Sequence, residues 1–173
     1  MKSIEKDLIQ KIGLPFNLID MVLSEENKTI IDFKIRLCEI DKNQDMELVE
    51  QLGLTARFDI VLKTDSINAC ILTGLTVGNV YKFYNMLKDA YEKSDGYAQL
   101  KEYGTNSGTG FSVVFDVSGL CDVQGKFSDN GSINSGVKFD FHCERDCFCN
   151  SLKNLEYMFK EFAEFQGNEN FNF

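Results

Sequence analysis

A histidine and three cysteines share one short segment and are candidate zinc ligands. His142, Cys143, Cys147 and Cys149 lie within the run FHCERDCFC. Tetrahedral zinc sites use thiolates and imidazoles, typically in C-x2-4-C pairs that are well separated along the chain. Here Cys147 and Cys149 are two positions apart near a helix start, and His142 and Cys143 alternate on a strand, so the side chains diverge. The spacing favours buried structural thiols, and we expect no metal ion.

Nucleophilic catalysis of the triad type needs a base, and His142 is the only histidine in the chain. It lies on the polar face of a predicted strand among Lys138, Asp140 and Glu144. No Gly-x-Ser-x-Gly elbow accompanies it. Paired carboxylates can also perform acid–base chemistry, but 27 acidic residues make coincidental pairs certain. We assign no catalytic residue and expect no enzyme activity.

Two loop motifs resemble ligand-binding loops in part. The segment from Asp41 to Glu47 has the D-x-N-x-D start of a calcium loop, but Met46 stands where glycine is needed. Leu52 stands where the loop requires a bidentate glutamate. The run GTNSGTG lacks the lysine of a phosphate-binding loop and precedes a strand instead of a helix. Both segments are interpreted as solvated loops, and we expect no cofactor.

An acidic cluster is the candidate partner-binding site. It comprises Glu39, Asp41, Asp45, Glu47 and Glu50, offset only by Lys42. Such a run is usually a solvated face. A patch of one charge sign also accelerates association and selects complementary partners. The functional interpretation is a docking patch for a basic protein, and the alternative is plain solvated surface.

Apolar periodicity predicts the elements that position these residues. Alternation, clearest at Ile31, Phe33, Ile35 and Leu37, indicates half-buried strands. The predicted strands cover residues 18–23, 29–40, 56–63, 67–74, 111–118, 121–128 and 136–143. Helical spacing predicts a helix from Ser3 to Ile12, one capped by Thr76 and stopped by Ser94-Asp95-Gly96, and one over residues 147–165.

The connections between these elements indicate the fold class. Residues 97–110 are predicted to be a loop, Gly125 a bulge, and Asn130-Gly131 a hairpin turn. Short turns between consecutive strands mean antiparallel pairing. We therefore expect one α+β domain over residues 1–173. It would be a mostly antiparallel sheet of about six to seven strands, with two to three helices packed on one face.

Charge and composition narrow the classes of partner. The 173 residues include 18 basic and 27 acidic side chains, a net charge of −9. A net-acidic chain repels phosphates, so nucleic acids and anionic membrane surfaces are disfavoured. The first residues lack the apolar core of a signal peptide, and no apolar run is long enough to span a bilayer. We expect a cytoplasmic protein whose six cysteines are reduced.

The order of elements from residue 55 to 165 resembles a known family. The matching segments are ARFDIVLK, INACILTG, VYKFYNMLKDAY, FSVVFDVS, and VKFDFHCERD running into LKNLEYMFKEF. In this layout the chain resembles the WapI-type immunity proteins of bacterial polymorphic toxin systems. The resemblance implies a non-enzymatic inhibitor that blocks a cognate toxin, often a basic nuclease. It transfers no functional residue, and the first 50 residues have no counterpart in it.

Three classes of function follow from these observations. The first is a protein-binding inhibitor that occludes a basic partner. The second is a small ligand-binding domain or carboxylate-using enzyme with a pocket between sheet and helix. The third is an assembly protein that self-associates through an apolar patch around Phe171 and Phe173. The oligomeric state is left open by the sequence.

Overall fold

Strands and helices follow one another in two similar blocks along the chain. The computed structural model describes residues 13–24, 30–41, 47, 49, 53–101, 110–128 and 136–161. The first block is β1 (Phe16–Ser24), β2 (Ile30–Ile40), β3 (Thr55–Lys63), β4 (Asn68–Thr76) and α3 (Val77–Lys93). The second is β5 (Gly96–Lys101), β6 (Gly110–Phe115), β7 (Leu120–Ser128), β8 (Gly136–Glu144), the 3-10 turn η1 (Arg145–Phe148) and α4 (Cys149–Glu161).

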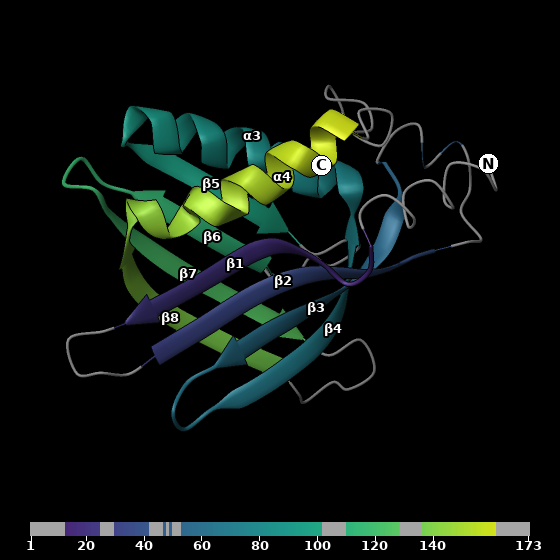
Figure 1. Ribbon diagram of the computed structural model, residues 1–173, viewed down its shortest axis with the longest axis horizontal. Helices are drawn as coiled ribbons and strands as arrows, with labels where there is room; N and C mark the ends of the chain where they lie inside the picture. Colours follow the sequence, from purple (N-terminus) through teal and green to yellow (C-terminus); the bar gives the residue numbers. More distant parts are fainter. Residues whose placement is uncertain are drawn as a thin grey trace.

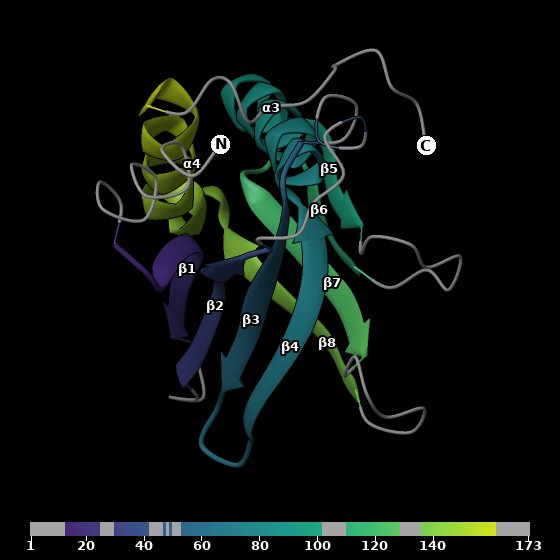
Figure 2. The ribbon, with the colours of Figure 1, turned by 90° about the vertical axis from the view of Figure 1, so that its right-hand side faces the viewer.

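Each block folds into its own antiparallel sheet. Sheet A has the order β1-β2-β3-β4 and sheet B the order β5-β6-β7-β8, so every strand pairs with its neighbour in the chain. The predicted α+β class and antiparallel pairing are confirmed, but the single sheet of six to seven strands is wrong. The two sheets lie face to face with their strands crossing steeply (Figure 1, Figure 2). The alternation of apolar and polar residues along the strands also fits two sheets, because each sheet covers the apolar face of the other.

The apolar faces of the two sheets form one continuous core. Phe33 of β2 is fully buried at its centre. Its ring centroid lies 5.4 Å from that of Phe111, 4.8 Å from that of Phe139 and 6.0 Å from that of Phe141. These aromatic contacts join β2 of sheet A to β6 and β8 of sheet B. The predicted alternation of β2 is confirmed, since Ile31, Phe33, Ile35 and Leu37 are all buried.

The strand β5 was not expected, because residues 97–110 were predicted to be a loop. Only Ala98 and Leu100 of β5 point into the core, and this is too short an alternation to stand out in the sequence. Pairing decides the conformation instead: β5 is hydrogen-bonded to β6 from Gly96, opposite Phe115, to Lys101, opposite Gly110. Residues 102–109 of the predicted loop lie outside the described residues.

The helices cover strand edges rather than one face of a sheet. Helix α4 packs on β1, α3 packs on β5, and the two helices contact each other (Figure 2). The predicted cap of α3 is confirmed: the Asn79 N–H donates to Thr76 Oγ1 at 3.1 Å, and Ser94 ends the helix in the left-handed conformation. Within the described ranges, neither helix has the length and apolar character needed to cross a bilayer.

Gly125 makes room for an aromatic ring and does not form the predicted bulge. Strand β7 pairs with both neighbours without a register shift, and Gly125 lies directly opposite Phe139. A Cβ at this position would lie 2.2 Å from the Phe139 ring. Bulges occur instead in β1 between Asn17 and Ile19, and in β2 between Leu37 and Glu39.

Several predicted features lie outside the described residues. They are the helix Ser3–Ile12, the core of the calcium-like loop at 42–46, the hairpin turn at Asn130-Gly131, and the tail with Phe171 and Phe173. The predicted final helix is present from Cys149 to Glu161 and is preceded by η1. Its predicted continuation over residues 162–165 also falls outside the described part.

Candidate functional site

The predicted acidic cluster is only partly described. Glu39, Asp41 and Glu47 have exposed positions, while Asp45 and Glu50 lie outside the described residues. Glu39 Oε2 is 3.4 Å from Arg57 Nη1, because the bulge in β2 brings Glu39 opposite Arg57 in the register. The structure therefore places a cation within the cluster that the sequence analysis counted as almost purely acidic.

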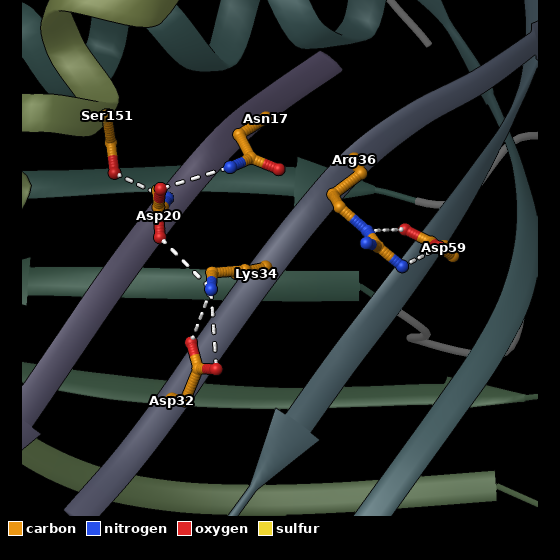
Figure 3. A network of polar contacts seen from close by, with 7 residues as sticks. All are labelled: Asn17, Asp20, Asp32, Lys34, Arg36, Asp59 and Ser151. Atoms are coloured by element: carbon orange, nitrogen blue, oxygen red, sulfur yellow. Dashed lines mark hydrogen bonds and ion pairs between the residues drawn. The ribbon is translucent and has the colours of Figure 1, made fainter. Parts of the chain in front are cut away.

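The outer face of sheet A carries charges that neutralise one another (Figure 3). Lys34 Nζ lies 3.7 Å from Asp20 Oδ1 and 3.1 Å from Asp32 Oδ1. Arg36 donates two hydrogen bonds to Asp59, one of them 2.8 Å long from Nε to Oδ1. The hydrogen bond to Asp59 raises the pKa of Arg36. Asp59 is only 7% exposed despite its outward position. These ion pairs follow the strand register and stabilise the sheet.

The same network includes a hydrogen bond between α4 and β1, the edge strand of sheet A. The Asp20 N–H donates to Ser151 Oγ at 3.1 Å, and Ser151 is fully buried (Figure 3). Asn17 Nδ2 donates to Asp20 Oδ2 at 3.1 Å. Strand β1 is an edge strand, so its outward N–H groups need partners other than a strand. The network is explained by packing, and we do not take it as the functional site.

The cysteines occupy several separate environments. Cys143 is buried directly opposite Cys121, and the thiol hydrogen bond between them together with burial raises the pKa of Cys143. Cys149 Sγ lies 3.1 Å from Tyr91 Oη. His142 is on the opposite face of β8, as its alternation with Cys143 predicted. Among the described residues, no group of three or more Cys, His, Asp or Glu is arranged to hold a metal ion.

The outward side of sheet B is the candidate functional site. We call it the open face: the outward positions of β5 to β8, most of them exposed. Its positions form rows across the strands. One row is Tyr97, Val114, Asp122 and His142; the next is Gln99, Ser112, Gln124 and Asp140; the third is Lys101, Gly110, Lys126 and Lys138.

One contact on the open face follows directly from the hydrogen-bond pattern. The Arg145 N–H donates to the Gly119 carbonyl at 2.9 Å, which makes this a hydrogen-bonded pair. Antiparallel pairs alternate, so Asp122 and His142 occupy a non-hydrogen-bonded position, where side chains approach more closely. His142 Nδ1 is accordingly 2.5 Å from Asp122 Oδ1.

Exposed apolar side chains gather at one end of the open face, which we call its apolar end. They are Tyr97, 61% exposed, Val114, 49%, Val117, 86%, and Leu120, 50%. Tyr97 is directly opposite Val114, and Leu120 is one diagonal step further along. Carboxylates surround the apolar end, either next to its residues along the chain or near them on a paired strand. They are Asp95, Asp116, Asp122, Glu144 and Asp146.

The turn at the apolar end is held by Asp116. Its Oδ1 accepts hydrogen bonds from the Ser118 N–H at 2.8 Å and the Leu120 N–H at 3.1 Å. A hydrogen bond from the Ser118 hydroxyl, together with these backbone bonds, lowers the pKa of Asp116. Val117 therefore lies on a turn whose backbone is fixed by these hydrogen bonds.

An open pocket of about 410 Å³ adjoins the apolar end. Ser94 at the end of α3, the turn from Val117 to Leu120, and Glu144 to Asp146 line it. Arg145 is held in place, because its guanidinium contacts the Ser94 hydroxyl and lies 5.0 Å from the Tyr91 ring centroid. The pocket lies at the end of sheet B, beside the C-terminal end of α3 and the start of η1.

The site thus belongs to an α+β protein of two four-stranded antiparallel sheets, and it lies on the outer face of sheet B. Compared with protein-family models, curated proteins and solved structures, the chain gives no match. The open face was not predicted from the sequence, because Tyr97 falls in a segment that was predicted to be a loop. The alternation of Tyr97, Ala98, Gln99 and Leu100 was the available signal for a strand there.

Proposed function

We propose that this protein is a non-enzymatic inhibitor of the immunity type that binds and occludes a basic toxin in the cytoplasm. The observation that supports it most is the apolar end of the open face. Protein-binding surfaces combine an apolar, aromatic centre with a polar rim. Tyr97 and Leu120 supply such a centre, and both are accessible without any rearrangement.

Charge complementarity indicates a basic partner. Five carboxylates flank the apolar end, and Arg145 beside them is already engaged by Ser94, by Tyr91 and by one of the five, Asp146, whose Oδ1 lies 3.9 Å from Arg145 Nε. The whole chain carries a net charge of −9. A field of this sign steers basic proteins toward the surface and disfavours acidic ones. The resemblance to immunity proteins adds the class of partner, a toxin made by the same cell.

Inhibition would be steric and would not require chemistry. A partner that docks on the outer face of sheet B would be blocked if the surface that contacts sheet B includes its own functional site. Tyrosine is among the residues enriched at interface hot spots, where truncation costs at least ~2 kcal/mol. We therefore expect Tyr97→Ala to weaken partner binding by roughly 30-fold or more, at 1.4 kcal/mol per tenfold change.

The test is an affinity capture from the native cell with three baits: the natural chain, Tyr97→Ala combined with Leu120→Ala, and Leu72→Ala. Leu72 is a matched control, since it is 52% exposed on sheet A. We expect the natural chain and the control to retain one stoichiometric basic protein that elutes only at high salt. The captured protein must then lose its toxic activity when the natural chain is added.

Equal capture by all three baits would remove the apolar end from the proposal. A captured protein whose activity is unaffected by the chain would contradict the inhibitor function itself.

A second candidate function is small-molecule binding in the pocket beside the apolar end. Glu144 and Asp146 flank it, and its volume suits a small polar ligand. A panel of cationic metabolites would be screened for a rise in melting temperature. A rise that disappears in Glu144→Gln would favour this function over partner docking.

A further inference from the structure

Strand β4 is an edge of sheet A, and it lacks the protection that the other sheet edges have (Figure 2). At the β1 edge, the Asp20 N–H donates to Ser151 Oγ of α4. At the β5 edge, Asn79 Nδ2 of α3 donates to the Lys101 carbonyl at 3.4 Å. The β8 edge carries a charged or imidazole side chain at every second position from Lys138 to Glu144. Among the described elements, only β4 leaves its edge without a helix or a row of charges.

The residues of β4 favour the addition of another strand. The strand reads NACILTGLT and contains no charged residue and no proline. It pairs with β3 from Asn68 to Thr76 without a bulge. Lysine, proline and bulges are the features by which edge strands avoid pairing with another chain. Cys70 and Leu72 also expose apolar side chains beside the edge. This edge therefore offers its backbone to a further strand.

The hydrogen-bond pattern of sheet A determines which backbone groups of β4 face outward. The Val77 N–H donates to the Leu54 carbonyl, and the Thr64 N–H to the Ile67 carbonyl, each at 2.7 Å. Both pairs continue the register of β3 and β4, in which hydrogen-bonded pairs alternate with pairs that are not. The odd-numbered residues of β4 therefore bond to β3. The even-numbered residues direct their N–H and carbonyl groups to the other side, where no described strand lies.

We infer that a second copy of this chain adds its own β4 to this edge, antiparallel to the first. The two-fold axis is perpendicular to sheet A and passes midway between the Leu72 residues of the two copies. The two four-stranded sheets then continue into one another, with their outer faces on the same side. Leu72 has outward backbone groups, so the two Leu72 residues exchange both of their N–H to carbonyl bonds. This inference goes beyond the proposed function, because β4 contributes no residue to the open face.

Strand β4 fits its own copy in length, charge and shape. Leu72 is the middle residue of the strand, so this axis pairs the whole strand, with Asn68 opposite Thr76 of the second copy. No charged side chain of β4 meets another, because β4 has none. Cys70 lies opposite Gly74, which leaves space for the thiol. Because α4 packs on β1 at the far edge of sheet A, association stops at two copies.

The edge is small, so the dimer is weak. Nine residues at ~3.4 Å and a thickness of ~10 Å, the spacing of stacked sheets, give an edge of roughly 300 Å². Each partner in a standard interface buries ~800 Å². Main-chain hydrogen bonds supply the affinity in strand addition. We expect a dissociation constant of about 100 µM, so the chain should be monomeric at about 5 µM and mostly dimeric at about 500 µM.

The experiment uses sedimentation equilibrium of the full chain and of two variants, Leu72→Lys and Leu72→Glu. Each variant alone places like charges opposite each other at the axis, so we expect roughly tenfold weaker association and a mass near 19.7 kDa. An equimolar mixture pairs opposite charges there and should recover the dimer. Val22→Lys is the control, since Val22 is exposed on β1, and it should dimerise normally. Circular dichroism checks that each variant is folded.

Hydrogen exchange of the natural chain gives a second readout, measured by mass spectrometry with residue-resolved fragmentation. The amides of Cys70, Leu72 and Gly74 should exchange about three- to fourfold more slowly at about 500 µM than at about 5 µM. The Ile71 amide bonds to β3 in both states and should not change. Raising salt from about 50 to about 500 mM should not weaken the dimer, because no attraction between charges holds it.

A natural chain that stays monomeric at about 500 µM overturns the inference. So does a dimer that persists unchanged in both Leu72 variants, or one that leaves the exchange of the three outward amides unaltered. Partner capture is carried out at low micromolar concentration, where the chain is a monomer. Its outcome is therefore independent of this one, and either idea can fail while the other stands.

Discussion

Replacing Gly125 by alanine should destabilise the protein, although alanine is the better strand residue. The new Cβ would lie 2.2 Å from Phe139 Cζ, while ordinary contacts begin near 3.4 Å. The ring must therefore withdraw by about 1.2 Å, the difference between these two distances. It has little room, because its centroid is 4.8 Å from that of Phe33 and 5.8 Å from that of Phe141.

The magnitude follows from two opposing effects. Overpacking a tight core costs ~1–3 kcal/mol. Alanine loses less backbone entropy than glycine on folding, and this stabilises the folded state by roughly 0.5–1 kcal/mol. We expect a net loss of about 1–2 kcal/mol, which lowers the melting temperature by roughly 2–8 °C in a chain of this length.

The assay is urea denaturation followed by circular dichroism, since the chain has no tryptophan. Phe139→Leu is the partner variant, because it removes the ring that the new Cβ would strike. In the double variant the two costs should fall short of additivity by about 1 kcal/mol. Purely additive costs, or a Gly125→Ala variant more stable than the natural chain, would refute the steric explanation.

Two further predictions concern the polar contacts. Asp59→Asn should lower the free energy of unfolding by about 1.5–3 kcal/mol, because it weakens a charged pair whose carboxylate is nearly buried. Glu39→Gln is its control, because both side chains of the Glu39–Arg57 pair are more than half exposed, and losing this pair should cost under ~1 kcal/mol. Both costs would be measured by urea titration, and equal costs for the two variants would contradict the greater importance of the Arg36–Asp59 pair. The hydrogen bond with Cys149, together with burial, raises the pKa of Tyr91 from its ordinary value of 10 to about 12. The folded state therefore keeps this proton where the unfolded state loses it, so the contribution of Tyr91 to stability is complete below pH 10 and lost between pH 10 and about 12. Absorbance titration at the tyrosinate band should show one tyrosine returning toward pH 10 in Cys149→Ala, and no such change would show that the contact with Cys149 is not the cause.

The candidate site shows where sequence reasoning ends. The acidic cluster was found by counting charges, but a count carries no information on pairing. Arg57 neutralises Glu39 only because a one-residue bulge at Cys38 moves Glu39 into register with it. The apolar end of the open face combines residues from β5, β6 and β7. Its exposure depends on the packing of the other described elements, none of which covers this end of sheet B, and no local pattern specifies that packing.

Local patterns in the sequence by themselves determined the strands β1 to β4 and β6 to β8, the capped helix α3, and the inward direction of residues such as Phe33 and Cys143. Side-chain periodicity and capping are properties of neighbouring residues, so they survive without any knowledge of the fold. Only the tertiary structure decided what each apolar face packs against. The division into two sheets, the strand β5, the contact of Phe33 with Phe111 and Phe139, and the bond from Asp20 to Ser151 all join segments far apart in the chain. Periodicity predicts which face of a strand or helix is buried, and the packing of the whole chain determines which element covers that face.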